Sequence, residues 1–376
     1  MAAFVRVSER SKVVVMSTHR IFIGTYTASS APAGRGEGIY TLTVDTDAQT
    51  FSEPQLVADI ESGSWLTHHA GAGVLWAARE EAVGSVAAFK IKDDATLVAL
   101  PSSDVPTGAG SPCHMALSPN GDRLIISSYG DGAVSDIALT ESGEAARNEE
   151  GEVSLAVHNH EGSGPNKDRQ GSPHAHSATV APDGEHVIVA DLGTDELRRF
   201  DFTFDGALSE LGIVAKLPGG AGPRHLAVSE EFIYVTGELD NAVHILRWED
   251  DASATYLGSV PAGDPETIGG PGDTFPGHLE LSADGTRLWV ANRGANIIAT
   301  FAVEDDGMTL RHLADAPVGG ENPRHFARVG DAIVVGHQNT DGLALMPLDS
   351  NGVAQAPVTQ ISLGSPVCVV PIPSIG

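Results

Sequence analysis

The stretch Gly171-Ser-Pro-His-Ala-His-Ser-Ala-Thr-Val-Ala-Pro-Asp-Gly-Glu-His-Val-Ile-Val-Ala-Asp-Leu-Gly193 has the pattern of a β-hairpin. Two short runs of strand-forming residues, 176–180 and 186–190, lie on either side of Pro182-Asp183-Gly184. This triplet supplies the fixed φ and the positive φ that a tight turn needs. Because the strands of a hairpin are antiparallel, His176 and the polar end of the second run should share the edge opposite the turn.

The hairpin is a unit that recurs along the chain. Aligning each copy by its turn gives seven residues that begin a first strand: Leu66, Cys113, His176, Arg224, Gly277, Arg324 and Val367. Successive starts are separated by 43 residues (324 to 367) to 63 residues (113 to 176). Strand pairs with Gly, Pro and Asp turns at this period are typical of a β-propeller. The sequence therefore predicts an all-β fold, a seven-bladed β-propeller with four-stranded blades.

The two ends of the chain complement each other. The last start, within 364–371, has almost no chain after it, whereas the N-terminal strands at 21–26 and 38–44 have no first strand before them. We expect the C-terminal strand to join the N-terminal strands, which closes the ring and removes its open edges. Residues 19–376 should then form a single propeller domain, and residues 1–18 an N-terminal extension without ordered structure.

Composition restricts the classes of partner. The net charge of −28 repels nucleic acid and anionic membranes, and no cluster of Lys and Arg reverses it locally. The only cysteines, Cys113 and Cys368, form no disulfide framework, which favours a reducing compartment. The apolar run 13–16 is too short for a signal peptide or a membrane span, and Met16 is an alternative start. We expect a cytoplasmic monomer or weak homo-oligomer.

A second set of equivalent positions lies where each second strand ends. It comprises Tyr26, Arg79, Tyr129, Leu192, Glu238, Arg293 and Gln338. Because first strands surround the axis of a propeller, both sets should meet at one mouth of the ring. The polar residues expected there are His176, Arg224, His225, Glu238, His278, Arg293, Arg324, His325 and Gln338.

Charge at this mouth is unbalanced. Four arginines, at 79, 224, 293 and 324, face chiefly Glu238 in a chain that is strongly acidic overall. Guanidinium groups bind carboxylates and phosphates through paired hydrogen bonds, so the cluster indicates an anionic ligand. The alternative is a solvated polar lining whose charges satisfy one another.

The histidines also suggest a second kind of site, one that binds a metal ion. His158-x-His160 and His174-x-His176 each place two imidazoles on one face of a strand, a pairing that zinc, iron or manganese can use. No Cys, Asp or Glu completes a ligand set at the usual spacing, so we expect neither metal nor cofactor. The polar insertion 141–170 is either a solvated loop or a lid over the mouth.

Several short motifs together identify a family. They are Pro173-His-Ala-His-Ser177, Gly222-Pro-Arg-His225, Gly237-Glu-Leu239, Asn292-Arg-Gly294, Asn322-Pro-Arg-His-Phe326 and His337-Gln-Asn339. In this order and spacing, the chain from about Ile21 to its C-terminus resembles the seven-bladed lactonase family. That family includes propeller-type 6-phosphogluconolactonases and fungal carboxy-cis,cis-muconate cyclases. Its blade-five strand carries Glu before His, the reverse of Gly277-His278-Leu-Glu280, so no role is carried over to His278 or Glu280.

The resemblance implies hydrolysis of a sugar lactone, 6-phospho-glucono-1,5-lactone to 6-phosphogluconate in the pentose phosphate pathway, with a small anionic lactone as the partner. A carboxymuconate-type lactonising cyclase is an alternative, since it would use the same arginines on carboxylates. A non-catalytic propeller that binds a protein is a third alternative. Such a scaffold would expose aromatic residues on its outer loops, whereas only 5% of the residues are aromatic. The sequence leaves these alternatives open.

Roles follow from what lactone hydrolysis requires. The anion must be held, the carbonyl oxygen stabilised and a water deprotonated. A carboxylate among arginines should have a low pKa and be a weak base, which favours His176 as the base and Glu238 as its orienting group. The expected catalytic residues are His176, Arg224, Glu238 and Arg293, and the expected substrate-binding residues are His174, His225, Arg324, His325, Gln338, Arg79, Tyr129 and Arg169.

Overall fold

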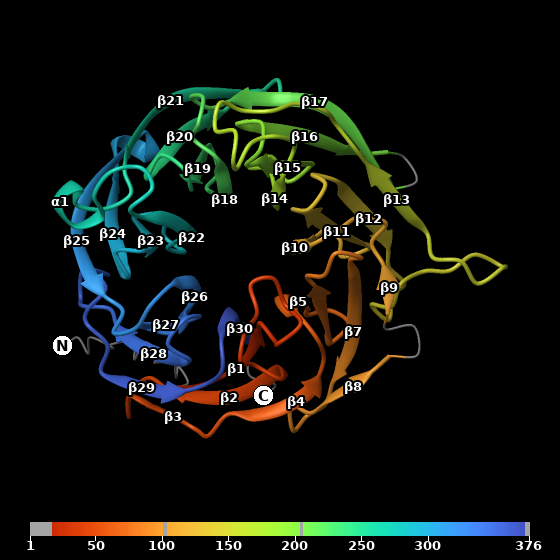
Figure 1. Cartoon of the computed structure of the whole chain (residues 1–376), viewed down its shortest axis with the longest axis horizontal. Coiled ribbons are helices and arrows are strands. Elements are labelled where there is room, and N and C mark those ends of the chain that lie inside the picture. The colour runs from red at the N-terminus through yellow and green to blue at the C-terminus, as the bar shows by residue number, and fades with distance from the viewer. Residues whose placement is uncertain (1–16, 101–103, 204–205, 373–376) are drawn as a thin grey trace, which may run out of the picture.

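The fold is a closed ring of seven antiparallel sheets around a central axis (Figure 1). The structure is a computed structural model that describes residues 17–100, 104–203 and 206–372. Within them, the helices are the four-residue α1 (Pro265–Ile268) and one 3-10 turn (Asp305–Gly307). The predicted all-β, seven-bladed propeller is confirmed. Of the expected N-terminal extension, residues 1–16 lie outside the described part.

Each blade has an innermost, a second, a third and an outermost strand. The innermost strands are β5 (Gly63–His69), β10 (Pro112–Leu117), β14 (Ala175–Val180), β18 (Pro223–Val228), β22 (Phe275–Leu281), β26 (Pro323–Val329) and β30 (Pro366–Ile372). The second strands are β6 (Val74–Arg79), β11 (Arg123–Ser128), β15 (His186–Asp191), β19 (Phe232–Gly237), β23 (Arg287–Arg293), β27 (Ala332–His337) and β1 (Thr18–Thr25).

The third and outermost strands complete the sheets. The third strands are β7 (Ser85–Ile91), β12 (Val134–Ala138), β16 (Glu196–Phe202), β20 (Ala242–Trp248), β24 (Ile297–Glu304), β28 (Gly342–Pro347) and β2 (Gly38–Asp45). Five outermost strands are continuous: β13 (Leu155–His158), β17 (Leu208–Lys216), β21 (Ala254–Pro261), β25 (Thr309–Pro317) and β29 (Thr359–Ser362). The other two are interrupted, as β8 (Leu97–Ala99) with β9 (Val105–Pro106), and β3 (Thr50–Phe51) with β4 (Gln55–Asp59).

The ring closes as the sequence predicts, with the C-terminal strand inside the N-terminal sheet. Strand β30 pairs antiparallel with β1, and Ile23 lies opposite Val369 in that ladder. Both side chains are buried in an apolar cluster that also contains Val334 and Leu343 of the preceding blade. The closure therefore removes two open edges and fills the gap between the last blade and the first.

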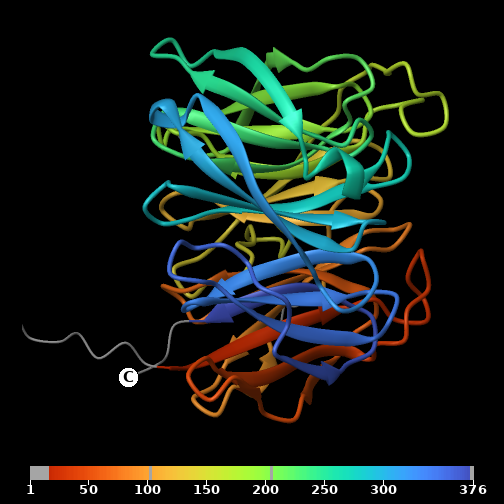
Figure 2. The same cartoon turned by 90° about the vertical axis from the view of Figure 1, so that its left-hand side faces the viewer.

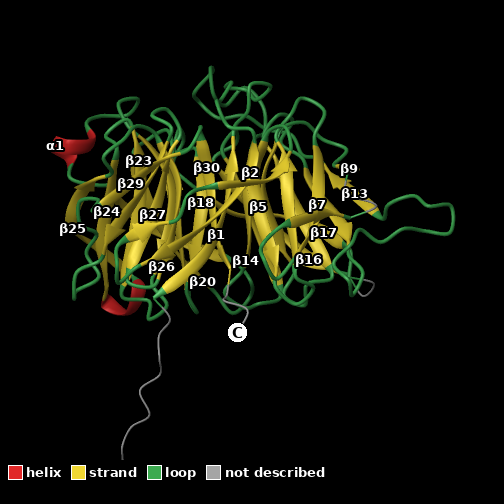
Figure 3. Cartoon of the chain, turned by 90° about the horizontal axis from the view of Figure 1, so that it is seen from below, coloured by secondary structure: helices red, strands yellow, loops and turns green. Residues whose placement is uncertain are grey.

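Each blade turns the same two ends to the two faces of the ring (Figures 2 and 3). The ladder of β14 and β15 pairs Ala175 with Asp191 at one face, and the turn at the other contains Gly184 with a φ of 72°. We call the face where innermost strands begin the mouth face, and the face that carries these hairpin turns the far face. Polar residues at strand starts are thereby gathered on the mouth face.

The insertion before β14 divides into two parts. Bridges between Leu139 and Ala145, and between Arg147 and Val153, make a narrow ladder that projects outward from the ring (yellow, next to β13 in Figure 1). Residues 141–153 therefore do not cover the mouth. Only the part after β13, residues 159–174, returns to the mouth face. Among the described residues, no helix has the length and apolar character needed to cross a membrane.

We expect ring closure to depend on the packing of β1 against β30. Replacing Ile23, which is 0% exposed, by alanine should lower the free energy of unfolding by about 2–5 kcal/mol, because it removes buried methyl groups and leaves a cavity. Val358→Ala, at a side chain 47% exposed, is the control and should change it by less than about 0.5 kcal/mol. Urea denaturation measures both. Equal effects of the two substitutions would contradict this account of the closure.

Candidate active site

Strand register shows which residues of different blades lie at the same level along the central axis of the ring. One ladder pair near the mouth is equivalent from blade to blade: Gly63 with Arg79, Pro112 with Ser128, Ala175 with Asp191, Pro223 with Gly237, Pro276 with Asn292, and Pro323 with His337. The residue that follows the second-strand member of each pair is therefore Glu80, Tyr129, Leu192, Glu238, Arg293 or Gln338, and in the closing blade it is Tyr26.

This register corrects the sequence alignment in one blade. There Gly63 pairs with Arg79, so Ser64 and Glu80 are the counterparts of Arg224 and Glu238, in place of Leu66 and Arg79. The turn after β5 reads Ala-Gly-Ala-Gly without a Pro-Asp-Gly, which shifted an alignment anchored on turns. The Arg79 guanidinium lies 3.5 Å from Glu81 and 3.4 Å from Asp104 and is thus paired within its own blade.

Glu238 is the centre of the mouth. Its Oε2 lies 2.9 Å from Arg224 Nε and 2.6 Å from Arg293 Nη2, and its Oε1 lies 2.6 Å from Arg169 Nη2. Both Glu238 and Arg224 are buried, at 3% and 1% exposure. One carboxylate thus holds three guanidinium groups that come from two blades and from the insertion.

Arg224 carries a buried charge that is only partly satisfied. Its Nε and Nη1 have no hydrogen-bond partner among the described residues, although Glu238 is close. Burial, followed by repulsion from Arg293 and Arg324, lowers the pKa of Arg224 to about 9, so the group remains a cation at neutral pH. The register of β18 shifts between Pro223 and Leu226, and this bulge re-aims Arg224 and its neighbour. A cation at this depth whose hydrogen-bond donors are not all used is suited to bind an anion.

Charges around Glu238 and His176 fix their protonation. Burial raises the pKa of Glu238, but the positive charges of Arg293 and Arg224 have the larger effect and hold that pKa well below its usual value. Burial, together with Arg224, lowers the pKa of His176 well below its usual value. At neutral pH the mouth therefore holds an ionised carboxylate and a neutral imidazole.

The opposite wall of the mouth contains a group that the sequence reading missed. The Tyr26 hydroxyl donates a hydrogen bond of 2.9 Å to Glu80 Oε2. Arg324 Cζ lies 5.3 Å from the centre of the Tyr26 ring, and Arg324 Nη2 lies 4.0 Å from Glu80 Oε1. Cys113, whose thiol pKa burial raises to about 12, lies 3.9 Å from His176 Nδ1. Glu80 escaped notice because it follows Arg79 directly, and only the ladder register identifies it as the equivalent of Glu238.

The returning part of the insertion covers one side of the mouth. Arg169 Nη2 also donates to the Tyr129 hydroxyl at 3.2 Å, and the His174 ring stacks on Tyr129 at 4.4 Å. Gln170 holds this segment in place through a 2.7 Å bond to Asp195. The structure thus gathers Arg169, Tyr129 and His174 on one side of the mouth, where Arg169 contacts Glu238; their part in substrate binding stays a prediction.

One step deeper, a layer of mostly aromatic side chains crosses the axis. By register it consists of Trp65, His114, Ser177, His225, His278, His325 and Cys368. His225 Nδ1 lies 3.0 Å from His278 Nδ1, and the rings of His278 and His325 stack at 4.0 Å. The structure therefore places His225 and His325 below the arginines, where they line a cavity of about 350 Å³ that opens toward the far face.

The remaining expected residues have their own partners. Gln338 accepts a 2.8 Å hydrogen bond from Asn322. His158 and His160, the first of the two pairs considered for a metal, lie 3.2 Å from Asp136 and 2.8 Å from Asp191. In the part of the chain that the structure describes, no group of three or more His, Cys, Asp or Glu side chains is arranged to hold a metal ion.

Comparison with known proteins agrees with this geometry. A family model described as "Lactonase, 7-bladed beta-propeller" matches residues 20–371. A 6-phosphogluconolactonase of Bacillus subtilis (strain 168) is 30% identical over 355 residues, which cover 93% of this chain and 97% of that protein.

Solved structures give the same result. A periplasmic gluconolactonase of Pseudomonas aeruginosa superposes with a TM-score of 0.85 at 28% identity, covering 95% of this chain and 100% of that one. A putative 6-phosphogluconolactonase of Bacteroides fragilis superposes with a TM-score of 0.83 at 25% identity, covering 97% and 100%.

The buried imidazoles should make the fold sensitive to acid. Burial lowers the pKa of His176, His225 and His278 well below the usual value, and that of His114 and His325 to about 3. These groups bind protons only after unfolding, so each should lower the free energy of unfolding by about 1.4 kcal/mol per pH unit below about pH 6.5.

Their effect should vanish above about pH 7.5, where the unfolded chain also leaves them neutral. Urea midpoints at pH 7.5, 6.5 and 5.5 measure this dependence, and His278→Gln, which removes one such group, should flatten it. A midpoint that is the same at pH 7.5 and 5.5 would contradict the assignment of these histidines as neutral.

Proposed function

We propose that this chain, which belongs to the seven-bladed β-propeller lactonase family and is a lactone-hydrolysing enzyme, acts on 6-phospho-glucono-1,5-lactone to release 6-phosphogluconate. The observation that carries the proposal is the buried Arg224 cation, whose Nε and Nη1 lack hydrogen-bond partners among the described residues. A bound anion would supply those partners. We further propose that the reaction serves the pentose phosphate pathway, as the name of the Bacillus subtilis relative suggests, and that it takes place in the cytoplasm, because both cysteines are free thiols.

Charge at the mouth supports a substrate with an anionic group. Arg169, Arg224, Arg293 and Arg324 contribute four positive charges, and Glu80 and Glu238 contribute two negative ones. The histidine inside this set, His176, is neutral, so two positive charges remain in excess. A phosphate group and an oxyanion that develops during the reaction would together balance them.

The chemistry divides among the chain's own side chains. His176 takes a proton from water as the water oxygen bonds to the lactone carbonyl carbon. The carbonyl oxygen becomes an oxyanion beside Arg224, whose preorganised charge stabilises it. The ring C–O bond then breaks, the leaving alkoxide takes the proton from the His176 imidazolium, and the new carboxylic acid ionises in solvent. Glu238 holds the arginines in place and stabilises the transient imidazolium.

The remaining arginine and the insertion complete the site. We propose that Arg324, positioned by Glu80 and by the ring of Tyr26, holds the phosphate on the opposite wall. His174, Tyr129 and Arg169 would contact the sugar hydroxyls from the side of the insertion. The gluconolactonase of Pseudomonas aeruginosa makes uncharged glucono-1,5-lactone the second candidate substrate. A single chain supplies every group named here, so we propose that it is active as a monomer.

Removing Arg224 should mainly slow the chemical step. Arg224→Ala should lower kcat by about 10²–10³, the effect of losing one donor to an oxyanion. Arg247→Ala, at an arginine on β20 paired with Glu249 outside the mouth, is the matched control and should leave kcat unchanged. Release of 6-phosphogluconate, corrected for spontaneous opening of the lactone, is the measurement. An Arg224→Ala enzyme with unchanged kcat would show that Arg224 does not face the reacting carbonyl.

Removing Arg324 should mainly weaken substrate binding. If Arg324 binds the phosphate equally in the ground state and in the transition state, Arg324→Ala should raise KM and leave kcat nearly intact. Uncharged glucono-1,5-lactone offers no phosphate, so its hydrolysis should be unaffected by the same substitution. A fall in kcat for both substrates would instead place Arg324 at the reacting centre.

A further inference from the structure

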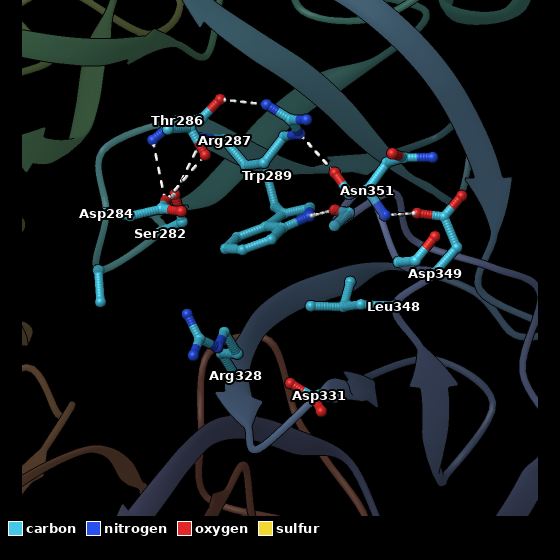
Figure 4. A pocket seen from close by; sticks show the side chains of 13 residues that line it. Ser282, Asp284, Thr286, Arg287, Trp289, Arg328, Asp331, Leu348, Asp349 and Asn351 are labelled. Carbon is cyan, nitrogen blue, oxygen red and sulfur yellow. Dashed lines mark hydrogen bonds between the residues drawn. The ribbon is translucent and has the colours of Figure 1, made fainter. Parts of the chain in front are cut away.

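A second cavity lies on the far face, away from the mouth. Its volume is about 630 Å³, within the range of small-molecule sites. Three loops line it: the β22–β23 turn at 282–287, the β26–β27 turn with Arg328 and Asp331, and the β28–β29 loop at 348–352 (Figure 4). It therefore lies between the fifth and sixth blades and shares no lining residue with the mouth.

The walls of this cavity are held by their own hydrogen bonds. Asp284 accepts bonds from Ser282 Oγ at 2.6 Å and from Thr286 Oγ1 at 2.8 Å, which fixes the first turn. Two side chains then bridge the blades: Arg287 Nε donates to Asn351 O at 2.6 Å, and Trp289 Nε1 donates to Gly352 O at 2.9 Å. The cavity is thus built before any ligand arrives, which reduces the entropic cost of binding.

Other polar groups in the same cavity have no such partners. Arg328 donates through Nε to Gly330 O at 3.1 Å, while its two terminal amino groups make no hydrogen bond among the described residues. The carboxylate of Asp331, across the cavity from Asp284 in Figure 4, and the side-chain amide of Asn351 likewise make none within the described ranges. Arg328 is half-buried and Asp331 and Asn351 are exposed, so water meets their free donors and acceptors until a ligand replaces it.

The lining selects against strongly charged ligands. Three carboxylates, of Asp284, Asp331 and Asp349, face two guanidinium groups, of Arg287 and Arg328. The balance of −1 disfavours a phosphate or a sugar acid, in contrast to the positive excess at the mouth. Leu348 is half-buried and adds a small apolar surface between the polar walls, whereas the indole of Trp289, only 2% exposed, lies beneath that surface (Figure 4).

We propose that this cavity binds an uncharged polyol, such as a neutral monosaccharide or disaccharide. A hydroxyl group both donates and accepts, so neighbouring hydroxyls can satisfy a carboxylate and a guanidinium group together. The C–H face of a sugar ring would pack on the half-buried Leu348. The site lies on the opposite face from the lactonase mouth and does not depend on the substrate proposed for that mouth.

The test is ligand-observed saturation-transfer NMR with the full-length protein, using D-glucose and maltose as neutral probes. D-Glucose 6-phosphate is the anionic probe and D-glucosamine the cationic one. We expect saturation transfer to the neutral sugars at millimolar concentration, and its loss in Asp331→Ala and in Asn351→Ala. Both positions are exposed, so the fold should tolerate the substitutions. Lactonase activity of these variants should equal that of the wild type.

Two controls separate this cavity from other sites. Glu230→Ala changes an exposed acidic residue in the corresponding turn of the β18–β19 hairpin and should leave the transfer intact. Arg224→Ala, which alters the mouth, should also leave it intact. The proposal is overturned if neutral sugars show no transfer, if Asp331→Ala retains it, or if Arg224→Ala abolishes it. Transfer to glucosamine alone would show that the cavity takes cations and would likewise overturn it.

Discussion

The mouth of this propeller depends on one constraint, the burial of the Arg224 cation beside a carboxylate that it shares with two other arginines. Removing a charge from water costs several kcal/mol even after the protein relaxes, and Glu238 compensates this only in part. The arrangement persists because the groups sit at the ends of rigid strands in a closed ring. The stability of seven blades thus maintains a site in which buried positive charge exceeds negative charge.

The strand ladders explain how such a site is built. Every innermost strand begins, and every second strand ends, at the mouth face, so each blade offers a residue from each strand to the same small volume. A bulge at the start of β18 lets the successive residues Arg224 and His225 serve two different layers. Arginines and carboxylates occupy the upper layer, and neutral imidazoles fill the lower one. Differences between blades at equivalent positions therefore give the mouth its chemistry, while the repeat gives it its geometry.

Much of this could be predicted from the sequence, because the signals were local. Turn triplets such as Pro182-Asp183-Gly184 set the strand register, and the unpaired ends of the chain implied the closure through β30. The pairing of Arg224 with Glu238 followed from their places in one hairpin. Where the turn triplet is missing, after β5, the alignment slipped and Arg79 took the place of Glu80.

Other features depend on contacts that no local pattern encodes. The insertion that carries Arg169 has no repeat to align with, and the structure separates its outward ladder from the segment at the mouth. His225 and His325 directly follow arginines in the chain, yet the bulge at the start of each strand sends their rings to the next layer. Only the folded ring shows that a single residue step separates the charged layer from the neutral one.

Relative activity on two lactones tests the central claim most directly. If the excess positive charge at the mouth binds a phosphate, kcat/KM for 6-phospho-glucono-1,5-lactone should exceed that for glucono-1,5-lactone by about 10²-fold or more, as expected for charge-assisted hydrogen bonds of about 1.5–3 kcal/mol each. The preference should shrink as salt is added. Equal kcat/KM values for the two lactones at low salt would contradict the claim that the excess positive charge at the mouth selects the substrate.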